Sequence, residues 1–428
     1  MKTTGSSAQP ARPTHTRYKV LGLAILLAAI TYLDRVSIAV TAPFIMRDLH
    51  LTKVRMSFVF SAFSLAYAIF EIPSGWLGDR IGARRVLTRI VAWWSSFTIL
   101  TGGAFNFPSL LAIRFLFGAG EAGAWPNVAR AFSRWFPSSE RGTTQGIFFM
   151  GAHLAGGVTP LLVTVLLRRF EWRVLFGMFG SVGFLWAIAW RRWFRDTPFE
   201  HPSVNAAERA YIESGQILAS PGRAETMPWR ILLANPTVVA LCLMYFTQTY
   251  GFNFYVTWLP SYLSSARGFS ALTLAIVSGL PLGLSVVADL AGGIATDRLS
   301  RRFGPRIGRA GVGGASLAAA GIFMLAGAFV SDPAPAAVLI SLAGASSNFL
   351  LGAAWGTCID VGGNHSGVLS AAMNSSGQVG GILSPILVGY VAEHFSNWSA
   401  PLYLTGGLYL LGALCWLWVE PSRLLVSD

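Results

Sequence analysis

Apolar runs of about 20 residues recur along almost the whole chain, and each is long enough for a helix to cross a hydrocarbon core about 30 Å thick. Inside lipid the backbone must satisfy its own hydrogen bonds, so these runs are predicted to be helices. A β-barrel would need shorter segments of alternating polarity, and runs such as Val20–Thr31 and Ala334–Ala345 do not alternate. The sequence therefore predicts an all-α membrane protein.

The chain has too few charged residues to cover a water-soluble globule. Only 12% of its 428 residues are charged, whereas soluble domains carry about 25%. Cys242, Cys358 and Cys415 lie singly in apolar segments without metal or redox spacing, and are interpreted as core residues. There is no phosphate-binding Walker loop, so ATP is not expected to drive the protein. We expect no enzymatic activity, no metal and no cofactor.

Twelve membrane spans are predicted from the apolar runs. They cover residues 20–41, 56–77, 86–104, 108–130, 143–167, 173–194, 234–263, 270–296, 309–330, 334–357, 367–391 and 400–419. With both termini on one side, 23 Lys and Arg residues lie on that side and 7 on the other. Positive charge accumulates on the cytoplasmic side of membrane proteins, so both termini are predicted to be cytoplasmic. Topology thus explains the net charge of +13, and no nucleic-acid partner is expected.

The longest polar stretch separates six predicted spans from the other six. It holds four prolines among mixed charges and is interpreted as a cytoplasmic linker with a short helix near Ala206–Ile217. The predicted organisation is a cytoplasmic tail (1–19), a six-helix bundle (20–194), the linker (195–233), a second six-helix bundle (234–419) and a short cytoplasmic tail (420–428).

The two predicted bundles share a local pattern at an offset of 218 positions. The matching positions are Glu71 with Asp289, Gly75 with Gly293, Asp79 with Asp297, and Arg80 with Arg298. Four matches at one offset, at the same point of each bundle, indicate an internal repeat. Parallel six-helix repeats are the organisation of major facilitator transporters.

Two motifs carry a resemblance to that superfamily. The segment Gly75-Trp-Leu-Gly-Asp79-Arg80-Ile-Gly82-Ala-Arg84-Arg85 resembles its loop 2–3 signature, and Gly293–Arg298 resembles the weaker copy in loop 8–9. Four further segments narrow the resemblance to the anion:cation symporter family: Tyr32–Arg35, Arg114–Glu121, Trp258–Leu263 and Asp196–Pro202. Members of that family carry sugar acids, hexuronates, aromatic acids and other organic anions. The resemblance implies a monomeric major facilitator fold that works by alternating access.

Six ionisable residues lie inside predicted spans, where each charge costs roughly 2.5–3.5 kcal/mol and needs a partner or a wet cavity. They are Asp34, Arg35, Glu71, Arg114, Glu121 and Asp289. Neighbouring residues point about 100° apart on a helix, so Arg35 can face a central cavity while Asp34 faces another helix. Arg35 is predicted to bind a substrate carboxylate through two parallel hydrogen bonds. An ion pair within the first bundle is the alternative.

Arg114 and Glu121 are seven positions apart and share one helix face. In the resembling sugar-acid symporters, the acids at the positions of Asp34 and Glu121 carry the coupling protons. The resemblance therefore implies a proton-coupling role for both acids, with Arg114 as the nearby cation. A static charge network is the alternative. Glu71 and Asp289 match each other in the repeat and are expected to be structural, although Asp289 is also placed to line the cavity.

Further polar side chains are predicted to line a substrate cavity. They are Tyr32, Tyr67, His153, Gln248, Tyr250, Asn253, Asn374 and Gln378. Tyr67 matches a position where relatives hold a substrate-contacting tyrosine. Hydrogen bonding between helices is the alternative for each residue. His153 stands where some relatives carry Gln or Arg, so it is interpreted either as a substrate contact with a pH-sensitive charge or as a satisfied core histidine.

The repeated motif is predicted to form a cytoplasmic gate. Its residues are Gly75, Asp79, Arg80, Arg84 and Arg85 in the first copy, with Asp297 and Arg298 in the second. Asp79 and Asp297 are expected to hold the cytoplasmic side shut by pairing with arginines and helix ends in the outward-facing state. Positive-inside topology with a capped helix is the alternative.

The residues together predict a proton-coupled importer of a small organic anion, such as a sugar acid or hexuronate. The alternatives are a proton-coupled efflux antiporter for drugs or metabolites, a Na⁺-coupled anion transporter, and a membrane receptor. Arginine heavily outnumbers lysine, which indicates a GC-rich bacterial source and hence the inner membrane; an organellar membrane is the alternative. The expected partners are the anion, the proton and the lipid bilayer.

Overall fold

The computed structural model describes residues 12–214, 234–269, 271–395 and 398–425, and these residues form helices without a β-strand. The first group of helices is α1 (Thr16–Asp48), α2 (Lys53–Ile81), α3 (Ala83–Gly102), α4 (Phe107–Glu121), α5 (Ala124–Trp135), α6 (Arg141–Leu166) and α7 (Trp172–Trp193). The second group, after the short α8 (Ala206–Ser214), is α10 (Pro236–Thr257), α11 (Leu259–Ser265), α12 (Ala271–Phe303), the π-helix η3 (Arg306–Gly311), α13 (Val312–Phe329), α14 (Pro333–Phe349), α15 (Leu351–Gly362), α16 (Ser366–Phe395) and α17 (Ser399–Cys415).

Eight helices within the described ranges are long and apolar enough to cross a membrane. Three of the predicted single spans are each built from two consecutive α-helices: 108–130 from α4 and α5, 234–263 from α10 and α11, and 334–357 from α14 and α15. The break between α4 and α5 falls at residues 122–123, where Gly123 precedes α5. The count of twelve spans therefore stays a prediction.

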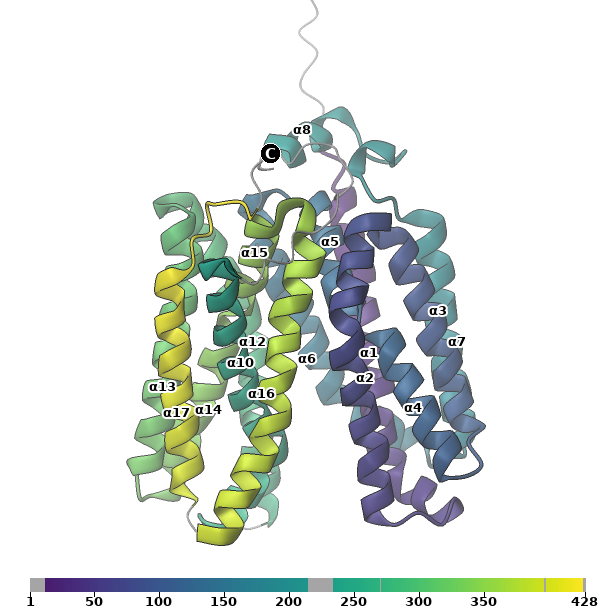
Figure 1. Ribbon diagram of the computed structural model, residues 1–428, viewed down its shortest axis with the longest axis vertical. Coiled ribbons are helices and arrows are strands. Elements are labelled where there is room, and N and C mark those ends of the chain that lie inside the picture. The colour runs from purple at the N-terminus through teal and green to yellow at the C-terminus, as the bar shows by residue number, and fades with distance from the viewer. Residues whose placement is uncertain (1–11, 215–233, 270, 396–397, 426–428) are drawn as a thin grey trace, which may run out of the picture.

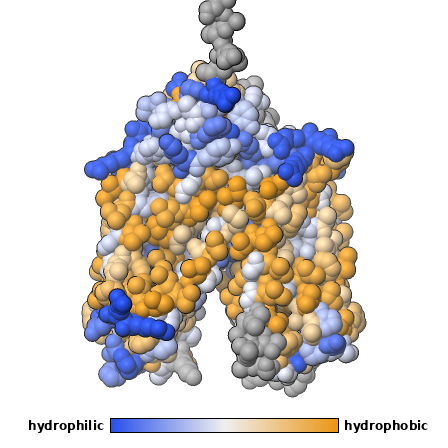
Figure 2. Space-filling model, turned by 180° about the vertical axis from the view of Figure 1, so that it is seen from behind, coloured by the Kyte–Doolittle hydropathy of each residue, from blue (hydrophilic) through white to orange (hydrophobic). Residues whose placement is uncertain are grey.

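The two groups of helices stand side by side, α1–α7 in one half and α10–α17 in the other (Figure 1). An apolar belt crosses the middle of the face shown in Figure 2, as a lipid-facing surface requires. Large apolar side chains are exposed in both halves, among them Leu65, Leu161, Leu185, Phe329 and Leu417. We call the face that bears Thr16, α8 and Leu425 the terminal face. The predicted tails and the linker beyond Ser214 extend outside the described residues.

The halves meet at the terminal face and separate at the opposite face, where a cleft lies between them (Figure 2). The main contacts between the halves pair α2 with α16 and α6 with α12. Glycines allow these close approaches. A Cβ atom at Gly75 would overlap the carbonyl oxygen of Gly367, and one at Gly293 would overlap that of Gly142. Gly75 and Gly293 are the matching glycines of the repeat, so the motif keeps both crossings tight.

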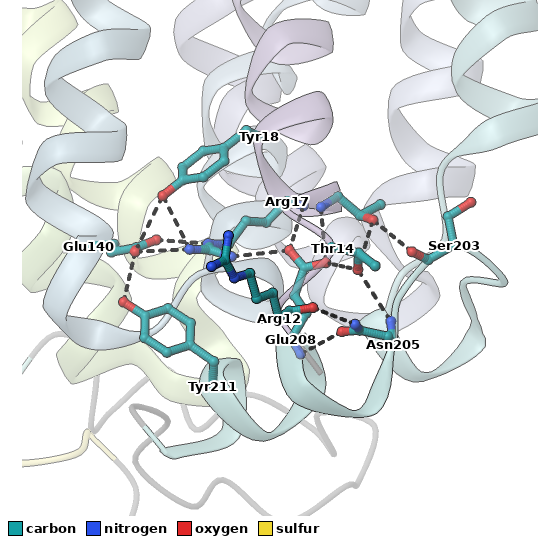
Figure 3. A network of polar contacts seen from close by, with 10 residues as sticks. Arg12, Thr14, Arg17, Tyr18, Glu140, Ser203, Asn205, Glu208 and Tyr211 are labelled. Carbon is teal, nitrogen blue, oxygen red and sulfur yellow. Dashed lines mark hydrogen bonds and ion pairs between the residues drawn. The ribbon is translucent and has the colours of Figure 1, made fainter. Parts of the chain in front are cut away.

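Helix α8 is tied to the start of α1 by one buried carboxylate (Figure 3). Glu208 accepts hydrogen bonds from the Thr14 hydroxyl (2.6 Å), the Thr16 N–H (2.9 Å) and the Arg17 N–H (3.1 Å). Arg17 also pairs with Glu208 (3.1 Å) and with Glu140, just before α6 (3.0 Å). Burial by itself would raise the pKa of Glu208, but the hydrogen bonds outweigh it and hold that pKa below its ordinary value.

Candidate functional site

A cavity of about 330 Å³ lies between the halves, near the middle of α1, α6 and α16. Its lining includes seven of the predicted substrate residues: Tyr32, Arg35, His153, Gln248, Asn253, Asn374 and Gln378. Tyr67 and Tyr250 are buried and do not line it. The α10 residues that do line it recur at helical spacing (Tyr245, Gln248, Thr249, Phe252, Asn253), and Tyr250 is off that face.

Arg35 carries positive charge to the wall of the cavity. Its Nε donates a hydrogen bond to Glu121, the last residue of α4. Its guanidinium also lies over the rings of Tyr67 (4.7 Å) and Phe63 (5.2 Å). The Arg35 side chain is 22% exposed, whereas Glu121 is fully buried. The ion pair within the first half is therefore present, and the same arginine also faces the cavity.

The two other predicted proton-coupling residues lie behind this pair. Asp34 is fully buried, and within the described residues neither of its carboxylate oxygens has a hydrogen-bond partner. Arg114 stacks over Phe117 (4.1 Å) and is within salt-bridge distance of no described carboxylate. The direct cation partner of Glu121 is thus Arg35, not Arg114. An unpaired charge inside a protein is costly, so Asp34 needs either a proton or a compensating charge at this position.

Aromatic side chains that sequence reasoning missed form much of the cavity wall. Trp125 stacks on Phe149 (5.8 Å), which contacts Trp355 (5.5 Å). The Trp355 indole N–H donates to the Tyr245 hydroxyl (3.1 Å). No sequence signal separates these rings from ordinary core aromatics, because their role depends on which helices surround the cavity. The result is a small chamber with rigid apolar walls.

Amide side chains supply the polar part of the lining. Asn348, another residue missed from sequence, donates to Ser285 (2.8 Å) and accepts from Gln248 (3.4 Å). On α16, Asn374 donates to Glu71, which also accepts from Ser375 (3.1 Å). Such groups provide both donors and acceptors, as a ligand rich in oxygen requires.

Glu71 and Asp289, expected to be structural, both join one half to the other. Glu71 on α2 contacts α16 as described above. Asp289 on α12 lies 2.6 Å from Nδ1 of His153 on α6. Both carboxylates are fully buried.

The terminal face is closed by two matching carboxylates of the repeat. Asp79 at the end of α2 accepts from the N–H groups of Gly367 (2.9 Å) and Val368 (2.7 Å) at the start of α16. Asp297 near the end of α12 accepts from the N–H groups of Gly142 (2.9 Å) and Thr143 (2.5 Å) at the start of α6. Helix N-termini leave such N–H groups unpaired and favour negative charge.

Each gate aspartate also has an arginine partner from its own half. Arg130 lies 3.4 Å from Asp79, and Arg309 lies 3.1 Å from Asp297. Arg309 and Arg141 also share Asp360, at 3.0 Å and 2.5 Å. Sequence reasoning counted these arginines only as topology and missed Asp360, because their contacts depend on which helix ends meet.

The motif arginines point away from the two gate aspartates. Arg80 is exposed and lies over the Trp76 ring (5.3 Å). Arg84 donates to the carbonyl of Arg191 (2.6 Å). Arg85 and Arg298 are exposed. Four of the arginines predicted for the gate thus make no direct contact with Asp79 or Asp297 within the described residues, because they project from the helix ends toward the surface.

Comparison with known proteins gives one family. A profile of the Major Facilitator Superfamily matches residues 24–385. The chain is 35% identical to a probable sulfoacetate transporter of Cupriavidus necator, over 95% of this chain and 94% of that protein. It is 32% identical to a probable galactarate/D-glucarate transporter of Bacillus subtilis, over 97% and 95%. It is 30% identical to a hexuronate transporter of Bacillus subtilis, over 91% of each.

Solved structures share the fold at low sequence identity. A proton:xylose symporter superposes with a TM-score of 0.74 at 13% identity, over 96% of this chain and 97% of that one. A second transporter, solved in the outward conformation, superposes with a TM-score of 0.73 at 13% identity, over 94% and 98%.

Proposed function

This chain belongs to the Major Facilitator Superfamily, and on that premise we propose that it imports a small organic anion together with protons by alternating access. The observation that carries the proposal is Arg35, which lines the cavity while its guanidinium is paired with Glu121. The relatives named for sulfoacetate, galactarate or D-glucarate, and hexuronate all act on small organic anions, which supports the same substrate class here.

The Arg35–Glu121 pair offers a direct way to couple protons to the anion. While Glu121 is ionised, it competes with the substrate for the guanidinium. A proton on Glu121 removes that competing charge, and Arg35 then binds the substrate's acidic group through parallel hydrogen bonds. Loss of the proton reverses the exchange and favours release. Asp34, buried on the same helix as Arg35, is the second proposed proton site.

The size and lining of the cavity suit a compact, oxygen-rich anion. A volume of about 330 Å³ is at the lower end of ligand pockets and suits a small molecule. Amide groups from Asn348, Gln248 and Asn374 would bind hydroxyl or acidic oxygens, and the aromatic walls fix the orientation. A drug-efflux pump would favour a more apolar chamber.

The contacts between the halves support alternating access. Asp79 and Asp297 close the terminal face, while the opposite face is open. We propose that two six-helix bundles, residues 20–194 and 234–419, rock about the cavity. We further propose that the terminal face is cytoplasmic, so that this conformation opens outward, and that the protein acts as a monomer in a bacterial inner membrane.

The test is uptake by purified protein in proteoliposomes. D-glucarate, D-galacturonate and sulfoacetate are supplied outside under an inward proton gradient, with a Na⁺ gradient in a parallel series. Uptake of one anion that collapses with a protonophore is expected. Uptake that follows only the Na⁺ gradient would overturn proton coupling. Proton-driven export of cationic or apolar compounds, with no anion uptake, would overturn the proposed substrate class.

A further inference from the structure

Two buried carboxylates lie eight positions, about two helical turns, before the gate aspartates of the repeat. Glu71 precedes Asp79 on α2, and Asp289 precedes Asp297 on α12. Each contacts the opposite half, but with different chemistry. The partners of Glu71 are an amide and a hydroxyl, whereas the partner of Asp289 is the imidazole of His153. Only the second pair has an imidazole partner, whose second ring nitrogen can also bind a proton.

The His153 ring joins this carboxylate to the cavity. Its Nδ1 lies 2.6 Å from Oδ2 of Asp289, while the ring lines the cavity beside Tyr32 (6.4 Å) and Phe252 (5.7 Å). Within the described residues Nε2 has no hydrogen-bond partner. When Nδ1–H donates to a carboxylate, neutral imidazole offers only a lone pair at Nε2. Protonated imidazole offers an N–H donor and a positive charge there.

The charge of the pair favours uptake of one proton. The Asp289 side chain is fully buried, and its second oxygen has no hydrogen-bond partner among the described residues. An ionised Asp289 with neutral His153 leaves one uncompensated negative charge inside the protein, which is costly. One proton on Nε2 brings the net charge of the pair from −1 to 0. The proton comes from water in the cavity, and no covalent bond of the substrate changes.

We propose that His153 and Asp289 form a third proton-binding site, beyond Asp34 and Glu121, whose protonated form donates a hydrogen bond from Nε2 to the transported anion. This deepens the proposed function and rests on it for the identity of the ligand as an anion. His153 then donates a hydrogen bond to a second acidic or hydroxyl oxygen of the substrate, while Arg35 binds the first acidic group. Asp289 acts through His153 as a positioning residue.

The other groups around His153 couple protonation of His153 to binding of the anion. From α1, the Tyr32 hydroxyl and the cationic Arg35 line the same cavity, with Glu121 behind Arg35. From α10, the Tyr245 hydroxyl lines it. The two lining residues from α15, Leu351 and Trp355, are uncharged. Arg35 disfavours a second cation in the empty cavity, and a bound anion cancels that repulsion. Proton uptake by His153 and anion binding therefore favour each other.

The first test needs no substrate. Protein labelled with ¹⁵N-histidine holds six histidines, and the resonances of His153 are those missing from H153Q. Between about pH 8 and about pH 5 the wild-type ring is expected to change from one protonated nitrogen to two. In D289N the imidazolium loses its carboxylate partner, so the same change is expected to need more acid. A His153 ring that keeps one protonation state across this range would overturn the proton site.

The second test counts protons taken up on binding. Calorimetric titration with D-glucarate and with sulfoacetate, in buffers of different ionisation enthalpy, gives the number of protons bound with each anion. H153Q is expected to bind one proton fewer than the wild type. For each unit of pH increase, its Kd should therefore rise about tenfold less than the wild-type Kd does. The control is H50N, which removes an exposed histidine and suits the left-handed backbone at that position.

The outcomes separate the two proposals. An unchanged proton count in H153Q, with both proteins folded by size exclusion and thermal melting, would overturn the coupling of His153 to the anion. If the wild type binds neither anion while His153 still titrates in the labelled protein, the proposed substrates are wrong and the proton site stands. If His153 does not titrate while anion uptake is proton-coupled, the proposed function stands and the third site falls.

Discussion

Asp79 and Asp297 make the same contacts on opposite halves of the molecule. Each carboxylate accepts hydrogen bonds from two successive N–H groups at the start of a helix in the other half, and each has an arginine partner from its own half. Because the two residues are matching positions of the repeat, the terminal face is closed by two copies of one device. In the proposed alternating-access cycle, both copies would open before the cavity reaches that face.

Neutralising either gate aspartate should loosen the terminal face. The reporter is S133C, since Ser133 is buried there and lies 3.3 Å from Ser366 of the other half. D79N and D297N are each expected to raise the rate of thiol labelling of this cysteine about tenfold, from the ~1.5 kcal/mol that a hydrogen bond to a charged group contributes. D332N is the control, because Asn caps a helix as well as Asp. Unchanged labelling in both gate variants would contradict the closing role.

Arg35→Lys should impair anion binding although the charge is kept. Lysine cannot make two parallel hydrogen bonds to an acidic group, and it loses the flat contact with the Tyr67 and Phe63 rings. Binding of the transported anion, measured by calorimetry, is expected to weaken by at least about tenfold, equivalent to ~1.4 kcal/mol. Arg47→Lys, at an exposed arginine of the same helix, is the matched control. Equal affinity in R35K would exclude Arg35 as the anion clamp.

Glu121→Gln should separate anion movement from proton movement. The amide cannot ionise, so it no longer gives up a proton in exchange for the Arg35 guanidinium. Uptake driven by a proton gradient is expected to fall to background, while exchange of internal for external substrate continues. Both are measured in the same proteoliposomes with labelled substrate. Loss of exchange as well as uptake would instead mark Glu121 as a structural support for Arg35.

Asp360→Asn should lower the stability of the folded protein more than an Asp→Asn change at an exposed position. Asp360 lies between Arg141 (2.5 Å) and Arg309 (3.0 Å), and all three side chains are buried. Removing the charge leaves Arg141 without a carboxylate partner, a change that costs about 3–5 kcal/mol in buried pairs. A clear drop in thermal unfolding temperature in detergent is expected, against little change for the exposed D332N. Equal melting of the two variants would contradict this.

Docking of α8 should weaken in acid because of Glu208. The pKa of this carboxyl is lower in the folded protein than its ordinary value of 4.5. The ionised group therefore stabilises the docked helix above about pH 4.5, and that stabilisation is lost as the pH falls below it. As the pH is lowered from about 6 to about 4, through the ordinary pKa of 4.5, protection of the α8 amides from hydrogen exchange should fall. Protection is calculated relative to the exchange rate of an unfolded chain at the same pH. E208Q should exchange fast at both pH values; identical protection in E208Q would refute the role.

The sequence could predict the features that depend on the chain alone. Helical runs, the repeat at an offset of 218 and the polar side chains that recur at helical spacing are all local signals. Seven predicted cavity residues do line the cavity, and Arg35 and Asp34 do point to different surroundings. The superfamily resemblance agrees with the profile match.

What the sequence could not predict depends on which helices meet. Arg130 and Arg309 look like ordinary surface arginines until the helix ends beside them are known. Tyr250 shares a helix with Gln248 but lies off the face that lines the cavity. His153 and Asp289 come from different halves, and no periodicity links positions that far apart. In each case a contact between halves decides the role, and such contacts leave no local pattern.

The contacts of Asp79 and Asp297 with helix starts in the opposite half also have a consequence for synthesis of the protein. Asp297, the partner of the Gly142 N–H, is synthesised 155 residues after Gly142. Gly367, a partner of Asp79, is synthesised 288 residues after Asp79. At about 5–20 residues per second, the ribosome leaves these groups without partners for roughly ten seconds to a minute. The first half must therefore persist in the bilayer with a charged, unsealed end. A chain cut short before α16 lacks the N–H groups of Gly367 and Val368, so Asp79 is left with Arg130 as its partner.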